Sequence, residues 1–163
     1  MLSSLELKIK EIVQNCIVYP LEVFELKVQT GRNHSLIEIV LDNLQHPTGS
    51  VTISECEKIS RFVSKELEQL GEEFDFTLQV GSAGAERAIR LPLELKRFIG
   101  QKARIFYYTE DNKIIEGIFI IQEIEGEFVI LKEVKKNNKK TKEVNLLKIE
   151  ISKIQKGNLA LNI

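Results

Sequence analysis

The stretch that decides the fold is Val51-Thr52-Ile53-Ser54-Glu55-Cys56-Glu57-Lys58-Ile59, which opens an amphipathic helix. Thr52 and Glu55 match a capping box, in which the threonine hydroxyl accepts from the third helical N–H and the glutamate reaches back. Gly71 ends the predicted helix. The apolar residues recur every three or four positions, as one buried helix face requires: Ile53, Cys56, Ile59, Val63, Leu67 and Leu70.

Three segments with alternating apolar residues surround this helix and predict β-strands. Residues 21–29 and 36–42 precede it, with a turn at Gly31-Arg32-Asn33, and residues 74–80 follow it. We expect the first two strands to form an antiparallel hairpin. The order helix-strand-strand-helix-strand predicts an α/β sandwich-like N-terminal domain, with helices on one face of a sheet. The N-terminal helix has its own apolar stripe: Leu2, Leu5, Ile9, Ile12, Val13 and Cys16.

The second half of the chain is rich in predicted strands. Gly117, inside the longest of them, is typical of a bulge or a tight bend. Five short strands in about 60 residues predict a small closed all-β barrel, because closure removes exposed strand edges. The fold class is therefore α+β. The predicted strands span residues 103–109, 113–124, 127–132, 144–149 and 159–163.

Small residues at 81–85, followed by Pro92, place the domain boundary near residues 84–95. We expect an N-terminal domain over residues 1–90 and a C-terminal domain over residues 91–163.

Acidic and basic residues are unevenly distributed along the chain. Residues 1–92 carry 9 Lys and Arg against 14 Asp and Glu, whereas residues 93–163 carry 14 against 10. An acidic surface suits a basic protein partner, and a basic surface suits phosphate groups. Small domains also differ by a few charges without functional meaning, so charge alone leaves both interpretations open.

The cysteines and the apolar runs indicate the compartment. Cys16 and Cys56 have no CxxC neighbour and form no disulfide framework, which suits a reducing compartment. The N-terminus lacks the pattern of a signal peptide, and no apolar run approaches the length of about 20 residues that crosses a bilayer. We expect a cytoplasmic protein without membrane contact.

Catalytic and metal-binding groups are not predicted. His34 and His46 fall in polar loops without a partner at metal-ligand spacing. Cys56 lies near a helix start, where the dipole lowers a thiol pKa, but its place in the apolar stripe predicts a buried core thiol. Cys16 receives the same interpretation. We therefore expect no enzyme, no metal, no cofactor and no small-molecule substrate.

The segment Gly81-Ser82-Ala83-Gly84 follows a predicted strand, as phosphate-binding loops do. A P-loop requires Lys-Ser or Lys-Thr after its last glycine, and neither follows Gly84. No parallel strand-helix-strand unit is expected there. The Gly-x-Ser-x-Gly elbow of hydrolases is not matched either.

A cluster of lysines forms the most basic segment of the chain. Lysines on a hairpin loop suit contact with RNA phosphates. The alternative is a solubilising loop at a sheet edge, where lysine blocks aggregation. The cluster has no interleaved aromatic residues, so base stacking is not predicted for it. Its members are Lys135, Lys136, Lys139, Lys140 and Lys142.

Several segments, in their order, resemble the RimP family of ribosome maturation factors. Ile39-Val40-Leu41-Asp42, a loop ending at Gly49, and the helix with Cys56-x-x-x-Ser60 are similar to the family's strand, glycine loop and helix. The segment from Phe76 to Arg87 resembles the family's Leu-Glu-Val-Ser-Ser-Pro-Gly-x-x-Arg. Phe98-Ile99-Gly100, followed by a strand, resembles the start of its second domain.

The chain departs from the family pattern at three positions. Gln79 replaces a glutamate, Gly81 replaces a serine and Ala83 replaces a proline. Because proline fixes φ, its replacement by alanine loosens the backbone of this segment.

The resemblance implies an SH3-like β-barrel as the C-terminal domain and a non-enzymatic role in late assembly of the small (30S) ribosomal subunit. The implied partners are a ribosomal protein and nearby 16S ribosomal RNA on a small-subunit precursor, bound by a monomer. The acidic half then suits the ribosomal protein and the basic half suits the RNA. The alternatives are a general RNA- or protein-binding adaptor without a ribosomal role and, as a third class, an enzyme of unrecognised type.

Seven residues are candidates for partner binding. Asp42 is expected to cap or orient the loop between strand and helix, with a plain turn-forming carboxylate as the alternative. Ser82 and Gly84 stand at matching family positions and are expected to shape the loop backbone.

The other four candidates are basic residues beside the domain junction. Arg87 and Arg90 contact the partner or hold the two domains together, and the sequence leaves both possibilities open. Lys96 and Arg97 extend the positive charge of this segment.

Overall fold

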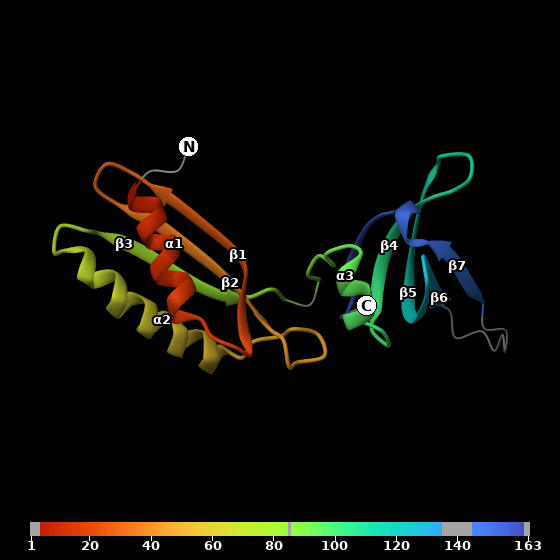
Figure 1. Cartoon of the computed structure of the whole chain (residues 1–163), viewed down its shortest axis with the longest axis horizontal. Coiled ribbons are helices and arrows are strands. Elements are labelled where there is room, and N and C mark those ends of the chain that lie inside the picture. Colours follow the sequence, from red (N-terminus) through yellow and green to blue (C-terminus); the bar gives the residue numbers. More distant parts are fainter. Residues whose placement is uncertain (1–3, 85, 135–144, 162–163) are drawn as a thin grey trace. The chain divides into compact units, whose positions relative to one another are not determined.

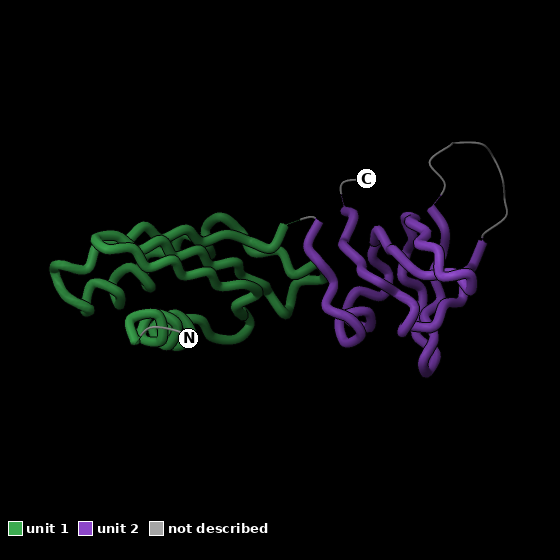
Figure 2. The backbone as a smooth tube through the Cα atoms, turned by 90° about the horizontal axis from the view of Figure 1, so that it is seen from above, with its two compact units in different colours: residues 1–84 green, residues 85–163 purple. Residues whose placement is uncertain are grey.

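The structure is a computed structural model that describes residues 4–84, 86–134 and 145–161 (Figure 1). The chain divides into two compact units, residues 1–84 (unit 1) and residues 85–163 (unit 2), shown in different colours in Figure 2. Each unit has its own hydrophobic core. In the described residues, no helix is long and apolar enough to cross a membrane.

Unit 1 has the predicted order helix-strand-strand-helix-strand. Its helices lie on one face of a three-stranded sheet (Figure 2). Side chains of both helices and of the central strand form the core, which places the core between the helical layer and the sheet. The elements are α1 (Ser4–Cys16), β1 (Leu21–Thr30), β2 (Ser35–Asn43), α2 (Ile53–Leu67), the short 3-10 helix η1 (Glu68–Leu70) and β3 (Phe76–Ser82).

The strand order in unit 1 is β1-β2-β3. β1 and β2 form the expected antiparallel hairpin, whereas β3 runs parallel to β2. The expectation that no parallel strand-helix-strand unit is present was wrong, because α2 carries the chain back across the sheet and β2-α2-β3 is such a unit. The alternation of apolar residues is the same in parallel and antiparallel strands, so it does not reveal their direction.

The capping box at the start of α2 is confirmed. Thr52 Oγ1 accepts from the Glu55 N–H at 3.1 Å, and Glu55 Oε1 accepts from the Thr52 N–H at 3.1 Å. The apolar stripe is confirmed only in part, since Ile53 is 80% exposed and Cys56 is half-buried. The first turn of α2 extends beyond the core, and the buried residues of the helix lie further along, at Val63 and Leu67.

Among the described residues of unit 1, no helix covers the second face of the sheet. Along β2, Ile37, Ile39 and Leu41 point into the core. Successive side chains of a strand point to opposite faces, so Glu38 and Val40 belong to the uncovered face. We call this surface the open sheet face.

The described residues of unit 2 form five strands and a short helix that the sequence did not predict, α3 (Leu93–Arg97). The last strand was predicted at residues 159–163, but the observed strand ends at Leu159, and Ala160 and Leu161 are not in a strand; residues 162–163 lie outside the described residues. The observed last strand skips one residue in its pairing, between Ile154 and Lys156, so it has no regular alternation of apolar residues that would predict its position. The strands are β4 (Lys102–Tyr108), β5 (Ile114–Glu125), β6 (Phe128–Glu133), β7 (Leu146–Glu150) and β8 (Ile154–Leu159).

The sheet of unit 2 is antiparallel throughout, in the order β7-β6-β5-β4-β8. β7 and β8 lie at opposite edges, about 19 Å apart in a flat sheet of five strands. Only the 3-10 turn η2 (Ile151–Lys153) joins them, and such a turn advances about 2 Å per residue. The sheet must therefore curl strongly, in agreement with the predicted small barrel.

Gly117 lies at a close internal contact of this curled sheet. The pairing of β4 with β5 is regular at Gly117, and the register shift in β5 falls between Ile121 and Glu123. A Cβ at position 117 would lie 2.7 Å from Cζ of Phe119. The glycine therefore makes room for the Phe119 ring.

Candidate partner-binding site

The loops at one edge of unit 1 bring together three of the predicted residues. β2 and β3 are parallel, so their carboxyl ends meet at the same edge of the sheet, where open α/β sheets bind their ligands. Asp42 lies at the end of β2, Ser82 at the end of β3, and Gly84 follows it. α2 begins beside them, because Val51, two residues before the helix, is hydrogen-bonded to Ser82.

Ser82 joins the segments of this edge. Its Oγ accepts a hydrogen bond from the Val51 N–H at 3.1 Å and lies 3.5 Å from the Gly84 N–H. The next residue, Ala83, donates its N–H to the Leu41 carbonyl at 3.1 Å. The segment after β3 is therefore bonded to β2 and to the start of α2. These hydrogen bonds hold the segment in place although position 83 is alanine and not proline.

Asp42 is 3% exposed. The loop that follows is closed by its own hydrogen bonds: the Asn43 N–H donates to the Gly49 carbonyl at 3.0 Å, and Asn43 Oδ1 accepts from the Gln45 N–H at 3.0 Å. Asp42 therefore sits at the base of an ordered loop. That position agrees with an orienting role for its carboxylate, which stays a prediction.

Arg87 lies inside unit 2. Its side chain is fully buried, and Nη2 donates to both carboxylate oxygens of Glu94, at 2.7 and 2.6 Å. Its Cζ lies 5.0 Å from the centre of the Phe98 ring. Charge-assisted hydrogen bonds of this kind are stronger than bonds between neutral groups. The burial favours a structural role for Arg87 over direct contact with a partner.

Glu94, in α3, accepts hydrogen bonds from several residues at the start of unit 2. Besides Arg87, it accepts from the Arg90 N–H at 2.8 Å and from Arg97 Nη1 at 3.4 Å. The guanidinium of Arg97 also lies 5.0 Å from the Phe98 ring. The sequence did not reveal this cluster, because Arg87 and Glu94 are seven positions apart and the short helix that contains Glu94 carries no strong signal.

The exposed part of this segment combines charge with apolar surface. Arg90 and Lys96 are exposed, whereas Arg97 is half-buried. Leu93 is 86% exposed and Ile99 is 42% exposed. Exposed apolar residues beside basic ones are typical of a contact surface. Leu93 and Ile99 are candidates that the sequence analysis missed.

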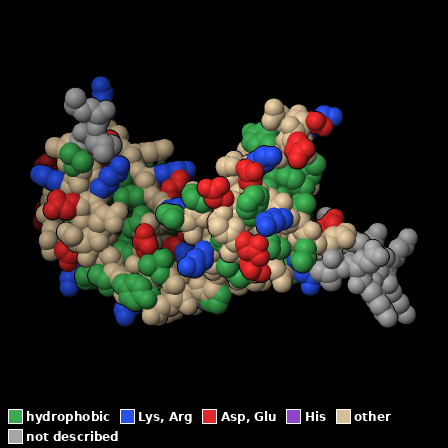
Figure 3. Space-filling view, turned by 45° about the vertical axis from the view of Figure 1, so that its right-hand side comes forward, with side chains coloured by type: hydrophobic (Ala, Val, Ile, Leu, Met, Phe, Trp, Pro, Cys, Tyr) green, Lys and Arg blue, Asp and Glu red, His purple; other side chains and the backbone are tan. Residues whose placement is uncertain are grey.

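The charge of unit 2 is balanced outside one segment. Its described residues carry 11 Lys and Arg against 10 Asp and Glu, and Figure 3 shows both signs interspersed over one of its faces. Residues 135–144 carry five Lys and one Glu. The predicted RNA-contacting lysines lie in this segment, outside the described residues.

The cysteines are poorly suited to nucleophilic chemistry. Burial raises the pKa of the Cys16 thiol, and the charge of Glu66 raises it further. Burial also raises the pKa of the Cys56 thiol, with a second contribution from Glu55. A nucleophilic cysteine needs the opposite shift, since the thiolate is the reactive form.

The histidines have structural partners. His34 Nδ1 lies 2.8 Å from Asp75 Oδ2, and its Nε2 lies 2.7 Å from Thr77 Oγ1. Within the described ranges, no three His, Cys, Asp or Glu side chains are grouped so as to hold a metal ion.

These features define a two-unit α+β protein whose ordered loops and exposed mixed surfaces are suited to binding a macromolecule. A profile of the RimP N-terminal domain matches residues 9–86. The ribosome maturation factor RimP of Leptospira interrogans (strain Fiocruz L1-130) is 41% identical over 157 residues, which cover 96% of each chain. RimP of Leptospira biflexa (strain Patoc 1 / Ames) is 41% identical over 158 residues, covering 97% of this chain and 98% of that protein.

The chain belongs to the RimP family of ribosome maturation factors. This membership confirms the resemblance found in the sequence and supports a role in ribosome maturation.

Proposed function

We propose that the chain acts in the cytoplasm, as a monomer, in late assembly of the small (30S) ribosomal subunit. It docks transiently on a subunit precursor and holds a local arrangement of ribosomal protein and 16S ribosomal RNA, without making or breaking a bond. No cofactor and no small-molecule substrate take part. The observation that carries the proposal is the acidic open sheet face of unit 1, within a family of ribosome maturation factors.

The open sheet face is acidic along β1 and β2. By register, Glu25 stands opposite Val40, and Lys27 stands opposite Glu38. Glu22 lies on the same face, two positions before a bulge in β1. Lys27 lies 3.5 Å from Glu25, so their charges offset each other. The net negative charge suits the basic surface of a ribosomal protein, because complementary charge steers association.

RNA contact is assigned to the lysines at 135–142. The described remainder of unit 2 is close to neutral, so these lysines provide nearly all of its positive excess. Each lysine that neutralises a phosphate releases a counterion, and binding then weakens as salt rises. The basic and apolar surface beside α3, with Arg90, Lys96, Leu93 and Ile99, lies in the same unit and extends the proposed contact.

The test is sedimentation of cell extract on sucrose gradients at low and moderate salt, with detection of the chain. We expect it to migrate with free small subunits or their precursors and to be absent from translating ribosomes. Reversal of two charges on the open sheet face, Glu25→Lys with Glu38→Lys, should move the chain towards the top of the gradient. Glu11→Lys, an exposed reversal on α1, is the matched control and should migrate as the wild type does.

Two outcomes contradict the proposal. If the double variant sediments with small subunits as the wild type does, the open sheet face is not the contact. If the wild type stays at the top of the gradient at both salts, and a deletion strain has normal subunit profiles, the ribosomal role is excluded. A general RNA- or protein-binding adaptor then remains.

A further inference from the structure

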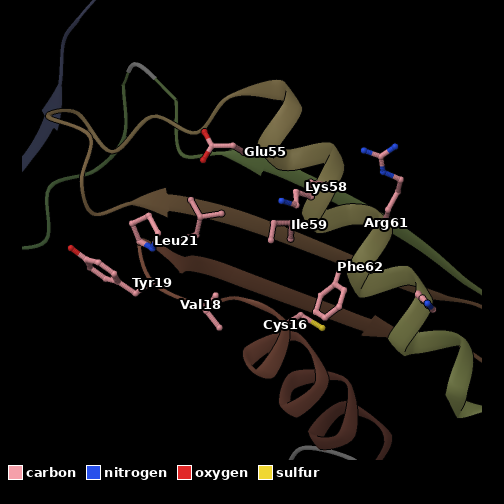
Figure 4. Close-up of a pocket in the computed structure, with 11 residues that line it drawn as sticks. Cys16, Val18, Tyr19, Leu21, Glu55, Lys58, Ile59, Arg61 and Phe62 are labelled. Carbon is pink, nitrogen blue, oxygen red and sulfur yellow. The ribbon is translucent and has the colours of Figure 1, made fainter.

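An apolar groove lies in unit 1 between the C-terminal end of α1 and the part of α2 from Glu55 to Lys65 (Figure 4). Its volume is about 660 Å³, within the range of sites that take a ligand or a few side chains. Cys16, Leu21 and Ile59 line its inner part. Phe62 comes from α2, and its ring lies beside Cys16 in Figure 4.

The edges of this groove expose large apolar side chains. Val18 and Tyr19, in the link between α1 and β1, are each 69% exposed, and Phe62 is 49% exposed. The Leu21 N–H donates to the Val18 carbonyl at 3.0 Å, so the backbone of this link is held in a turn. Bulky apolar residues gathered around one hollow mark a binding site, whereas singly scattered ones do not.

The charge along the groove is opposite to that of the unit as a whole. Residues 1–84 carry 7 Lys and Arg against 13 Asp and Glu, yet three of the seven line this groove: Lys58, Arg61 and Lys65. Lys58 points from α2 towards the space between the helices (Figure 4). Glu55 is the acidic residue among the described lining residues, and its carboxylate caps α2 through Thr52.

We propose that this groove binds an acidic peptide segment of a second protein. A bulky aliphatic or aromatic side chain of that segment fills the apolar hollow, and its carboxylates meet Lys58 and Lys65. These lysines are seven residues apart on one helix face, about 10 Å along the axis. An extended peptide spans that distance with about three residues, so its two carboxylates flank the apolar anchor closely.

This site goes beyond the proposed contacts with the ribosomal precursor. A basic ribosomal protein would bring like charges against Lys58 and Lys65, at a cost in affinity. RNA phosphates suit the lysines but leave the hollow between Val18 and Phe62 without an apolar group. An acidic segment with an apolar anchor satisfies both features.

The test begins with a phage-displayed library of random peptides, selected on the full chain and counter-selected on Phe62→Ala. Phe62 is half-exposed, so this variant keeps the core intact, and thermal unfolding followed by circular dichroism checks its fold. We expect the recovered peptides to share a bulky apolar residue with Asp or Glu on both sides. Fluorescein-labelled copies are then titrated with the full chain, and binding is measured by fluorescence anisotropy.

Charge reversal provides the matched comparison. Lys58→Glu with Lys65→Glu should weaken binding of the recovered peptides by about tenfold, since two exposed charge contacts are lost and two repulsions added. Arg32→Glu, an exposed reversal in the β1–β2 turn, should change affinity by less than about twofold.

The proposal fails if no peptide distinguishes the wild type from Phe62→Ala, if the recovered peptides lack carboxylates, or if the double reversal leaves affinity unchanged. Concentration-dependent self-association that Phe62→Ala abolishes would assign the groove to a second copy of the chain. Binding of an unpaired RNA oligonucleotide that the same variant abolishes would assign it to RNA. None of these measurements uses ribosomes, so their outcome is independent of the gradient experiment.

Discussion

Unit 1 lays two helices on one face of a three-stranded sheet, whereas unit 2 curls a five-stranded sheet around its own side chains. The first arrangement leaves a whole sheet face and a groove between helices open to other molecules. The second arrangement uses the inner face of its sheet for the core. The apolar face of the unit 1 sheet is therefore covered by the two helices of the same unit. The apolar face of the unit 2 sheet is covered because the sheet curls around it.

The two units also place charged groups differently. Unit 2 buries Arg87 against Glu94 and Phe98, so a charge becomes part of its interior. Unit 1 holds the carboxyl ends of β2 and β3 with neutral hydrogen bonds that Ser82 accepts, and it keeps Glu25 and Glu38 on the open sheet face. Proximity to the domain junction therefore does not by itself make a basic residue available for contact. Arg87 is buried, whereas Arg90, three residues further along, is exposed.

The largest effect should come from removing the buried charge pair. Arg87→Ala removes the closer guanidinium partner of the mostly buried Glu94, which keeps Arg97 Nη1 at 3.4 Å and the Arg90 N–H. We therefore expect a cost near the lower end for breaking a buried pair, about 3 kcal/mol. We expect unit 2 to unfold at much lower urea concentration while unit 1 is unaffected. Urea titration followed by two-dimensional NMR reports both units separately.

Arg104→Ala is the control for this experiment. Arg104 pairs with Glu116 on the surface of unit 2, and both side chains are partly exposed. Removing such a pair should cost at most about 1 kcal/mol. Equal losses in the two variants would contradict the importance of the buried pair.

A pair of glycine substitutions compares the two sheets. In Gly117→Ala the new methyl group would lie 2.7 Å from the Phe119 ring, inside the curled sheet of unit 2. Overpacking of this kind costs about 1–3 kcal/mol.

Gly81→Ala, in β3 of unit 1, is the matched substitution. Its new methyl group meets no atom within 4 Å, and alanine is favoured over glycine in a strand by about 0.5–1 kcal/mol. Thermal unfolding should therefore show a lower stability for Gly117→Ala and no decrease in stability for Gly81→Ala. A loss of similar size at both positions would remove the distinction between the filled and the open sheet.

Ser82→Ala tests whether neutral hydrogen bonds hold the edge of unit 1. The variant removes the acceptor of the Val51 N–H, at a net cost of about 0.5–1.5 kcal/mol. Amide hydrogen exchange at Val51 should become faster, because its N–H loses its partner. Ser54→Ala, at an exposed position of α2, is the control; faster exchange at Val51 in both variants would count against a specific role of Ser82.

The smallest effect is a pH dependence in unit 1. Burial raises the pKa of Cys16 and of Cys56 in the folded state. A raised folded pKa stabilises the fold below the unfolded thiol pKa of about 8.5, and this contribution is lost as pH rises through the folded pKa. The free energy of unfolding of unit 1 should therefore decline in mildly alkaline solution.

The double variant Cys16→Ala with Cys56→Ala provides the reference for this decline. Chemical unfolding at about pH 7 and pH 9.5 should show a larger loss in the wild type than in the variant. Identical losses would show that the two thiols do not cause the decline.

Local signals in the sequence predicted the elements of unit 1 well. The capping box of Thr52 and Glu55 spans four residues, and the hairpin before it is set by one turn. Strand direction was not predictable, because β2 and β3 show the same alternation in either direction. The helix α3 was missed because five residues are too short for a clear period. Its signal was Pro92 directly before the short apolar pattern at Leu93 and Leu95.

The candidate site was only partly predictable for the same reason. Ser82 and Gly84 were found because they lie in one recognisable loop. The burial of Arg87 depends on Phe98, eleven residues away, and on the folding of α3 between them. The groove depends on Val18 and Phe62, which lie in separate elements. Contacts between distant residues leave no pattern in a single short window of sequence.

The pairing of β8 has a consequence for how the chain folds during its synthesis. The first residues of unit 2 are held by its last strand: the Ile89 N–H donates to the Gly157 carbonyl, and the Leu159 N–H donates to the Arg87 carbonyl, both at 2.8 Å. Unit 1 needs no residue beyond its own segment for its core. A growing chain can therefore complete unit 1 while unit 2 stays open until β8 has emerged.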